Sequence, residues 1–293
     1  MNNSESDNNL ESHELYKFYS RSPYRSVKHS NYFKVYEDLL SKYRGREIIF
    51  VEVGIHNGGS LFMWREFFGE SARIIGIDLN PEAKIFEDYG FEIFIGSQSD
   101  PKFWKNFYKE VGKVDILLDD GGHTYDQQIT TVNSSIDNIN DSGMIIIEDT
   151  HTSYFKKFGY PTKYSFINWT KKLIDNINSR SNDININNAL YSETIFSIEI
   201  FDSIVALKID RVNSIKSFPT SNNSKTLNFK DFRFSYTKVE KIMEVFNNIE
   251  KRLYDKRKNN YTYKFVLKLN SIVSQNFLSL HNYFKNKKMR RFF

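Results

Sequence analysis

The sequence predicts an α/β fold in which helices cover a mostly parallel β-sheet. Five short apolar runs, rich in β-branched residues, lie near 48–53, 73–77, 91–95, 114–118 and 143–147. A glycine or an acidic residue directly follows each run, and the segments between the runs are long enough for helices. Runs of this length, bounded by glycine and polar residues, are typical of strands buried inside a parallel sheet.

The first predicted strand is preceded by a helical pattern at 30–43 and leads into a glycine-rich turn. This turn carries Gly54, Gly58 and Gly59 before the apolar helical stretch 61–68. Glycine lets a backbone approach a ligand closely, and the start of a helix offers unpaired N–H groups. The pattern is G-x-x-x-G-G rather than the dinucleotide pattern G-x-G-x-x-G, and no Walker lysine follows it. The turn therefore indicates a ligand site without identifying the ligand.

The second predicted strand ends at Asp78. An acidic residue roughly 20 positions beyond a glycine-rich turn is placed to accept hydrogen bonds from ribose hydroxyls. The interval from Glu52 to Asp78 is slightly longer than these 20 or so positions, and a longer loop would accommodate the difference. Asp78 is therefore predicted to bind the ribose of a nucleoside-containing cofactor.

Two acidic clusters follow the fourth and fifth predicted strands. Asp119 and Asp120 precede a Gly-Gly-His turn that ends at His123, and Glu148 and Asp149 follow the fifth run. Ligands bind beyond the carboxyl ends of parallel strands, so these side chains are expected to share one crevice. They could be a loop histidine and helix-capping acids, but neighbouring carboxylates repel one another unless a cation neutralises them. Oxygen-only ligands suit Mg²⁺ or Ca²⁺, and an imidazole can accept a proton near neutral pH.

The order of these features resembles class I S-adenosylmethionine-dependent methyltransferases. Four motifs are similar to the metal-dependent sugar O-methyltransferases of macrolide biosynthesis, and they lie at 58–64, 96–101, 119–123 and 147–150. The likeness covers about residues 22–210, and the stretch Lys28 to Tyr32 with Tyr36 matches less closely. The resemblance implies a Rossmann-like doubly wound sheet, mostly parallel and closed by a C-terminal antiparallel hairpin.

The resemblance also implies roles for individual residues. Asp120, Glu148 and Asp149 would hold Mg²⁺, and His123 would be the general base. The residues implied to lie at the S-adenosylmethionine site are Glu52, Gly54, Gly58, Ser60, Asp78, Gln98 and Asp119. S-adenosylmethionine is preferred over NAD because the glycine pattern fits it better. The family usually has Ser where this chain has Gly122, a difference that should loosen the turn without removing a ligand.

The expected reaction is methyl transfer to a hydroxyl of a sugar, carried by a glycoside or by a nucleotide. The metal would lower the pKa of the hydroxyl by Lewis-acid polarisation, and His123 would take its proton. Two alternatives stay open. One is a catechol-type O-methyltransferase, and the other is a non-catalytic protein that binds nucleic acid or a surface through a methyltransferase fold.

The domain organisation follows from composition and spacing. We expect a disordered tail at 1–14, a methyltransferase domain at 15–210, a polar linker at 211–235 and a helical basic extension at 236–293. Within the domain, 166–177 has helical apolar spacing. The β-rich runs 193–200 and 203–209 are joined so tightly that they must pair in antiparallel fashion.

Composition sets further bounds. The 293 residues contain no Cys, which excludes disulfides and thiol nucleophiles. Residues 251–293 carry twelve basic residues and one acid, so residues 1–250 have a net charge of −6 although the whole chain carries +5. We expect a soluble cytoplasmic protein without a signal peptide, and no nucleic-acid partner. The apolar face of the basic extension suits either self-association into a homo-oligomer or contact with a membrane surface.

Overall fold

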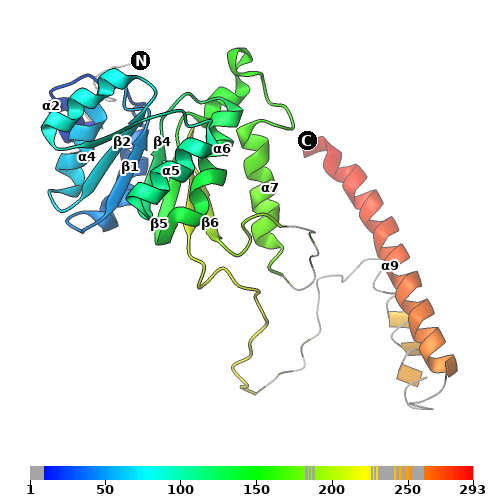
Figure 1. The fold of residues 1–293 in the computed structure, drawn as a ribbon. Helices are drawn as coiled ribbons and strands as arrows, with labels where there is room; N and C mark the ends of the chain where they lie inside the picture. The colour runs from blue at the N-terminus through cyan, green and yellow to red at the C-terminus, as the bar shows by residue number, and fades with distance from the viewer. Residues whose placement is uncertain are drawn as a thin grey trace. The chain divides into compact units, whose positions relative to one another are not determined.

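Seven strands form one mixed sheet in the computed structural model, in the order β3-β2-β1-β4-β5-β7-β6 (Figure 1). The strands are β1 (Ile49–Val53), β2 (Arg73–Asp78), β3 (Glu92–Ile95), β4 (Val114–Asp119), β5 (Ile139–Ile147), β6 (Ile195–Ile200) and β7 (Val205–Ile209). Strands β1 to β5 pair in parallel, whereas β7 runs antiparallel to both β5 and β6. The predicted mostly parallel sheet with a closing antiparallel hairpin is confirmed.

The structure describes residues 10–181, 189–225 and 261–292, with single positions at 184, 186, 227, 229, 241, 244, 245, 248, 249, 251 and 252. Most of the predicted disordered tail therefore lies outside the described residues. The same holds for most of the predicted linker beyond 225 and for most of 236–260.

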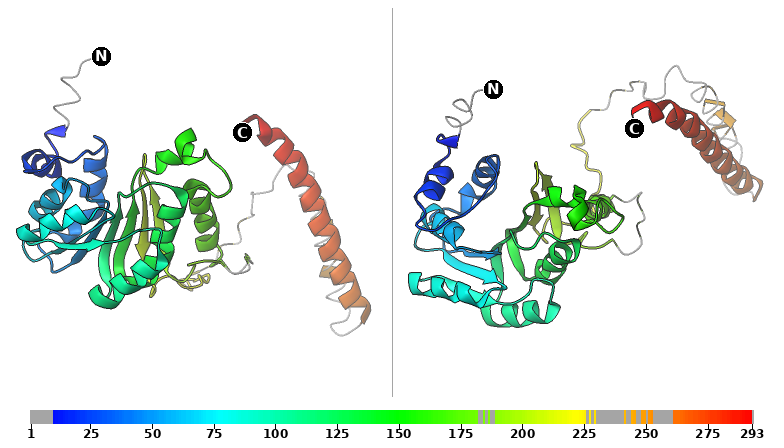
Figure 2. Two further views of the ribbon diagram at one scale, coloured as in Figure 1. Left: turned by 45° about the horizontal axis from the view of Figure 1, so that its top comes forward. Right: turned by 90° about the horizontal axis from the view of Figure 1, so that it is seen from above.

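Helices cover both faces of the sheet (Figure 2). They are α2 (Glu14–Arg21), α3 (Tyr32–Leu40), α4 (Gly59–Phe68), α5 (Pro101–Val111), α6 (Tyr125–Ser135) and α7 (Phe166–Asn178), with 3-10 turns that include η2 (Pro81–Tyr89) and η4 (Thr150–Tyr154). Helix α2 was not predicted. It forms because Leu15 is fully buried and the ring of Tyr19 packs edge-on against Phe33 of α3.

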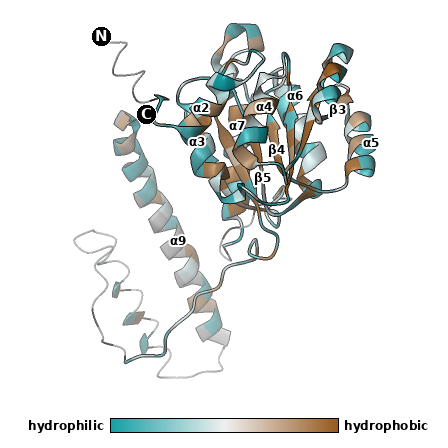
Figure 3. Ribbon diagram, turned by 90° about the vertical axis from the view of Figure 1, so that its left-hand side faces the viewer, coloured by the Kyte–Doolittle hydropathy of each residue, from teal (hydrophilic) through white to brown (hydrophobic). Residues whose placement is uncertain are grey.

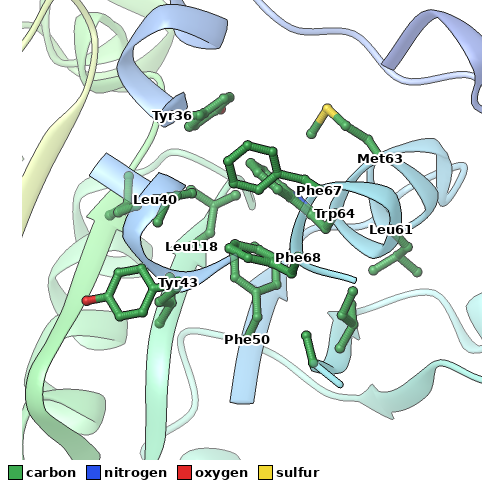
Figure 4. Packing of buried hydrophobic residues seen from close by; sticks show 14 of the residues in the cluster. Tyr36, Leu40, Tyr43, Phe50, Leu61, Met63, Trp64, Phe67, Phe68 and Leu118 are labelled. Atoms are coloured by element: carbon green, nitrogen blue, oxygen red, sulfur yellow. The ribbon is translucent and has the colours of Figure 1, made fainter. Parts of the chain in front are cut away.

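The first face of the sheet is packed with aromatic residues from α3 and α4. Trp64 and Phe68 of α4 lie against Phe50 of β1, and Tyr36 of α3 meets the Trp64 ring edge-on (Figure 4). Full burial of a large apolar side chain is worth about 1.5–3 kcal/mol. This cluster therefore fixes α3 and α4 firmly over β1.

The second face is covered by α5, α6 and α7. Trp104 and Phe107 of α5 pack in one cluster with Ile75 of β2, Leu117 of β4 and Leu173 of α7. Strands β4 and β5 are coloured as hydrophobic in Figure 3, and neighbouring residues of β4 enter opposite clusters, Ile116 and Leu118 on one face and Leu117 on the other. Burial on both faces explains why the sequence shows continuous apolar runs instead of alternation.

The chain divides into two compact units, residues 1–219 and 220–293. The first contains the whole sheet and its helices. In the second, residues Tyr261–Met289 form the helix α9. None of the helices seen in the described part of the chain combines the length and apolarity needed to cross a membrane.

The topology places the site at the carboxyl edge of the sheet, where the strand order changes direction. Strand β1 lies between β2 and β4, and backbone pairing continues one residue beyond the strands. The N–H of Asp120 donates to the carbonyl of Val53 over 3.0 Å, and the N–H of Glu148 donates to that of Asp119 over 2.9 Å. Parallel sheets open their ligand crevices at this switch point.

Candidate active site

A cavity of about 700 Å³ lies at the carboxyl edge of the sheet, a size typical of small-molecule sites. Its wall includes four of the predicted cofactor residues, Gly54, Ser60, Asp78 and Gln98. It also includes three residues of the predicted catalytic and metal set, Asp120, His123 and Asp149. Residues 25–27, from the loop between α2 and α3, line it as well.

Gly54 and Asp78 shape the end of the cavity next to β1 and β2. Gly54 has a φ of +85°, and a Cβ there would lie 2.3 Å from the backbone oxygen of Asp120. Asp78 accepts the backbone N–H of His56 through Oδ2 and that of Asn80 through Oδ1, both over 2.9 Å. Asp78 therefore holds the two turns around the cavity and also presents its carboxylate to it.

Three predicted cofactor residues lie behind the cavity wall instead of in it. Glu52 is fully buried and accepts the hydroxyl of Ser60 over 2.7 Å. Gly58 begins α4 in a left-handed conformation, and a Cβ there would collide with the ring of Phe86. Asp119 is buried, and burial raises its pKa. These residues build the wall and do not face the ligand space.

Gln98 links the third and fourth strand ends. Its Nε2 donates to Asp119 Oδ1 over 2.9 Å, and its Oε1 accepts the N–H of Gly122 over 2.8 Å. A Cβ on Gly121 would lie 1.9 Å from that same Oε1. The absence of a side chain on Gly121 thus leaves room for Gln98 to reach the turn that carries His123.

The departure from the family pattern at Gly122 has a structural counterpart. A Cβ at this position would lie 2.2 Å from Nε2 of Gln127. The Oε1 of Gln127 accepts the backbone N–H of Thr124 over 3.1 Å and so caps the start of α6. In place of a looser turn, the structure fills the space above Gly122 with the Gln127 amide.

Asp120, His123 and Asp149 converge in the same cavity, where the loops after β4 and β5 meet. One ligand atom from each lies within 4.8 Å of the others. His123 and Asp149 both adopt left-handed backbone conformations, with φ of +60° and +53°. Such conformations cost of order 1–3 kcal/mol each in non-glycine residues and cluster at functional sites. The two loops are tied together by the Thr152 hydroxyl, which lies 3.1 Å from the carbonyl oxygen of His123 and 2.8 Å from that of Asp149.

Asp149 is surrounded by groups that can donate protons. Its Oδ2 lies 3.4 Å from Nε2 of His123, and its Oδ1 lies 4.0 Å from Nε2 of His29 and 4.0 Å from Nδ1 of His151. The hydroxyl of Tyr32 donates to Oδ1 over 2.5 Å. Burial, together with this bond to a carboxylate, raises the pKa of Tyr32, so that its phenol remains a donor.

Glu148 does not join these ligand atoms. Its side chain is buried behind the wall, where its two oxygens lie 3.0 and 3.1 Å from Nζ of Lys28. The Tyr36 hydroxyl also donates to Oε1. Burial, followed by the charge of Asp120, raises the pKa of Glu148. The structure therefore brings Asp120, Asp149 and His123 together, and Glu148 shares the ammonium of Lys28 with Asp120.

The positive charge of Lys28 lies among the carboxylates of Asp120, Glu148 and Glu52. The Nζ of this lysine lies 2.7 Å from Asp120 Oδ2 and 3.6 Å from Glu52 Oε1, in addition to its contacts with Glu148. Burial alone would lower the pKa of Lys28, but the charges of Asp120, Glu148 and Glu52 raise it well above its usual value. Lys28 therefore stays charged.

The exposed part of the cluster suits a hard divalent ion. Asp120 and Asp149 present carboxylate oxygens to the cavity, and oxygen ligands are those that Mg²⁺ prefers. Only one oxygen of Asp120 contacts Lys28, which leaves the other available. Asp120 and Asp149 would hold such an ion, with His123 beside it.

The fold is that of class I S-adenosylmethionine-dependent methyltransferases. The architecture agrees with that of a crystal structure of MycE methyltransferase in complex with Mg, SAH and mycinamycin VI, at a TM-score of 0.62. That match has 23% sequence identity and covers 71% of this chain and 55% of the other.

Within this class, the chain is related in sequence to sugar O-methyltransferases. One relative is 8-demethyl-8-(2-methoxy-alpha-L-rhamnosyl)-tetracenomycin-C 3'-O-methyltransferase of Streptomyces olivaceus, with 33% identity over 132 residues. The aligned region covers 43% of this chain and 33% of that protein. A second relative is mycinamicin VI 2''-O-methyltransferase of Micromonospora griseorubida, with 28% identity over 131 residues. That aligned region covers 42% of this chain and 32% of the relative. The chain spans about a third of the length of these relatives, and no family model matches it. The resemblance inferred from the motifs is confirmed.

Proposed function

We propose that this protein transfers the methyl group of S-adenosylmethionine to a sugar hydroxyl, with a divalent metal ion, Mg²⁺, at Asp120 and Asp149. The observation that carries the proposal is the convergence of Asp120, His123 and Asp149 in one cavity that Gly54 and Asp78 also line. A single cavity of this kind suits the two substrates of a methyl transfer. The cofactor would bind next to β1 and β2, and the acceptor next to β4 and β5.

Each part of the site has a defined task in this proposal. Asp78 would accept the ribose hydroxyls, and the absence of a side chain on Gly54 would let the cofactor approach the backbone. A bound divalent ion would supply Lewis-acid polarisation of the acceptor hydroxyl. His123 would take the proton of that hydroxyl, and the charge of Asp149, 3.4 Å from its Nε2, would stabilise the imidazolium that forms.

The wall of the cavity favours a sugar over a catechol. None of the described residues that line it is Phe, Tyr or Trp. A catechol ring binds best between apolar aromatic walls, whereas a sugar needs polar partners such as Ser26, Asn57 and Gln127, which do line the cavity. The two relatives act, by their names, on rhamnosyl tetracenomycin and on mycinamicin VI. These names support a glycoside as acceptor. A nucleotide-linked sugar offers the same hydroxyls, but its phosphates would have to lie away from Asp120 and Asp149.

The carboxylates at the cavity also argue against a nucleic-acid substrate, since they would repel phosphate.

The proposed catalytic domain is 15–210, followed by a linker at 211–235 and the basic extension at 236–293.

Mass spectrometry of candidate acceptors tests the proposal. The protein would be incubated with S-adenosylmethionine and Mg²⁺ together with rhamnosides, nucleotide-linked deoxysugars or catechols. The expected result is methylation of a sugar acceptor, lost in the Asp149→Asn variant. Methylation of catechols alone would replace the sugar assignment with the catechol alternative.

A further inference from the structure

The helix α9 and the turn after it carry charge of one sign. Residues 261–292 contain seven Lys or Arg and no Asp or Glu, whereas residues 1–250 have a net charge of −6. A block of basic residues without acids attracts an anionic partner and repels a cationic one. The charge of this segment therefore restricts the partners that it can contact.

Large apolar side chains are exposed on the same helix. Five of them are between 48% and 66% exposed, namely Phe265, Ile272, Leu280, Tyr283 and Phe284. At about 100° of rotation per residue, all five lie within an arc of about 120° around the helix axis. Among the described side chains of α9, Asn276 and Lys287 are the polar members of that arc. These five residues form an apolar stripe along α9, the α9 stripe.

Exposed lysines flank the α9 stripe on both sides. On an ideal helix, Lys264 and Lys268 lie about 40–80° beyond the edge that Ile272 forms, and Lys288 lies about 40° beyond Phe284. All three lysines are exposed. Lysine can lay its methylene stem along an apolar surface while its ammonium reaches a polar layer. A flat partner with an apolar interior and an anionic surface could therefore contact the stripe and the lysines at once.

This combination separates three kinds of partner. A second copy of α9 would bring seven more basic residues against the first seven, so that the charges would oppose pairing. A nucleic acid would satisfy the charges and could stack on Tyr283 or Phe284, but Ile272 and Leu280 offer no ring for stacking. A bilayer with anionic lipids accepts both features, because basic amphipathic helices lie in its interface with their apolar face in the headgroup–acyl boundary.

We propose that α9 is a membrane-surface helix that binds bilayers containing anionic lipids. The α9 stripe enters the boundary between headgroups and acyl chains, and the flanking lysines contact the lipid phosphates. This binding is independent of the proposed methyl transfer, since no residue of α9 is among the described residues that line the cavity. Failure of either proposal would leave the other intact.

Flotation of the full chain with lipid vesicles tests the proposal. The vesicles contain either phosphatidylcholine alone or phosphatidylcholine with about 30% phosphatidylserine, an anionic lipid. The wild-type protein is expected to float with the anionic vesicles and to remain behind with the neutral ones. High salt should reduce the floating fraction, because it screens the attraction between lysines and headgroups.

Two sets of substitutions separate the contribution of the stripe from that of the charges. Ile272→Ser combined with Leu280→Ser should weaken binding to anionic vesicles at least about tenfold, because two apolar side chains no longer enter the bilayer. Lys285→Gln, Lys287→Gln and Lys288→Gln together should also weaken it at least about tenfold. The matched control replaces three exposed lysines of α5 by Gln, at positions 102, 105 and 109, and should bind as the wild type does.

A spectroscopic variant keeps the test valid if these substitutions unfold the helix. Phe284→Trp puts a fluorophore of similar size and apolarity in the α9 stripe. Its fluorescence should be quenched by anionic vesicles whose acyl chains carry bromine. The wild-type protein is the control, because its tryptophans at 64 and 104 are fully buried in the first unit and should keep their fluorescence.

Three results would overturn the proposal. Equal flotation with neutral and anionic vesicles, or none with either, would remove the lipid assignment. Wild-type binding by the folded Ile272→Ser and Leu280→Ser variant, with Phe284→Trp unquenched, would show that the stripe does not enter the bilayer. Binding of single-stranded DNA, measured by fluorescence anisotropy, in a protein that does not float would assign α9 to nucleic acid instead.

Discussion

At the scale of single residues, the site is a set of side chains placed by strand ends and held by specific partners. Asp78 holds two turns through its carboxylate, and His123 lines the cavity with its Nε2 3.4 Å from Asp149. Both residues were predicted from sequence position. Substituting Asp78 should affect cofactor binding, whereas substituting His123 should affect turnover.

Replacing Asp78 should weaken cofactor binding. Asp78→Ala removes a charged acceptor for ribose hydroxyls, which is worth about 1–3 kcal/mol. Titration calorimetry with S-adenosylmethionine measures the loss. Asp88→Ala is the control, because Asp88 is an exposed acid in the neighbouring turn η2. Equal affinity of Asp78→Ala and the parent would remove the nucleotide-site assignment.

Replacing His123 should slow turnover with little effect on cofactor affinity. His123→Ala removes the proposed general base, whose contribution is roughly 10²–10⁴-fold. The matched comparison is His151→Ala, since His151 also lies near Asp149 but at 4.0 Å. Steady-state rates of the two variants at neutral pH decide between the histidines. A larger loss in His151→Ala than in His123→Ala would move the base to His151.

At the scale of elements, the carboxyl ends of β1, β4 and β5 are close enough that one side chain in the wrong place would separate them. The tightest contact is at Gly54, where a Cβ would lie 2.3 Å from the backbone oxygen of Asp120. Because that neighbour is backbone, it cannot move aside without shifting the end of β4. The geometry of the metal site thus depends on a glycine at the end of another strand.

Gly54→Ala should therefore disrupt both the carboxyl edge of the sheet and the metal site. The positive φ alone costs roughly 1–2 kcal/mol in an alanine, and the collision adds about 1–3 kcal/mol. Gly69→Ala is a matched control, because Gly69 has a φ of +88° and open space around its Cβ position. Thermal unfolding of both variants isolates the collision. The same loss of stability in both would show that the contact with Asp120 is not important.

The sequence was sufficient to predict the elements whose signal is local. The strands were correctly predicted from their apolar runs, and the antiparallel hairpin from its short link at Phe201 and Asp202. Helix α2 was missed although Leu15, Phe18 and Tyr19 have helical spacing, because a single short turn of this pattern next to a polar N-terminal stretch gives a weak signal until it packs on α3.

The contacts of the site were less predictable. Lys28, Tyr32 and Tyr36 reach Asp120, Asp149 and Glu148 across about a hundred residues of sequence. A lysine in a polar loop carries no signal of burial, and two tyrosines four residues apart on a helix look like ordinary core. Adjacent acids such as Glu148 and Asp149 also point to opposite sides of a strand end, so only one of them faces the cavity.

At the scale of the whole molecule, the described site lies entirely within the first compact unit, residues 1–219. The net positive charge of the chain comes from the second unit, since residues 251–293 carry twelve basic residues and one acid. We therefore expect the chemistry to belong to the first unit.

A chain truncated after residue 219 should fold and bind S-adenosylmethionine as tightly as the full protein. It keeps the sheet, both helical layers and every residue of the cavity. Circular dichroism and calorimetry check the fold and the affinity. Loss of cofactor binding in a truncated chain that remains folded would show that residues 220–293 contribute to the site.

The dependence of turnover on a divalent ion tests the central claim most directly. Methyl transfer to a sugar acceptor would be followed by mass spectrometry in buffer, with EDTA, and with EDTA followed by excess Mg²⁺. We predict that EDTA abolishes turnover, that Mg²⁺ restores it, and that Asp120→Ala remains inactive although it still binds S-adenosylmethionine. Full turnover in the presence of EDTA would contradict the metal mechanism and leave His123 as the sole activating group.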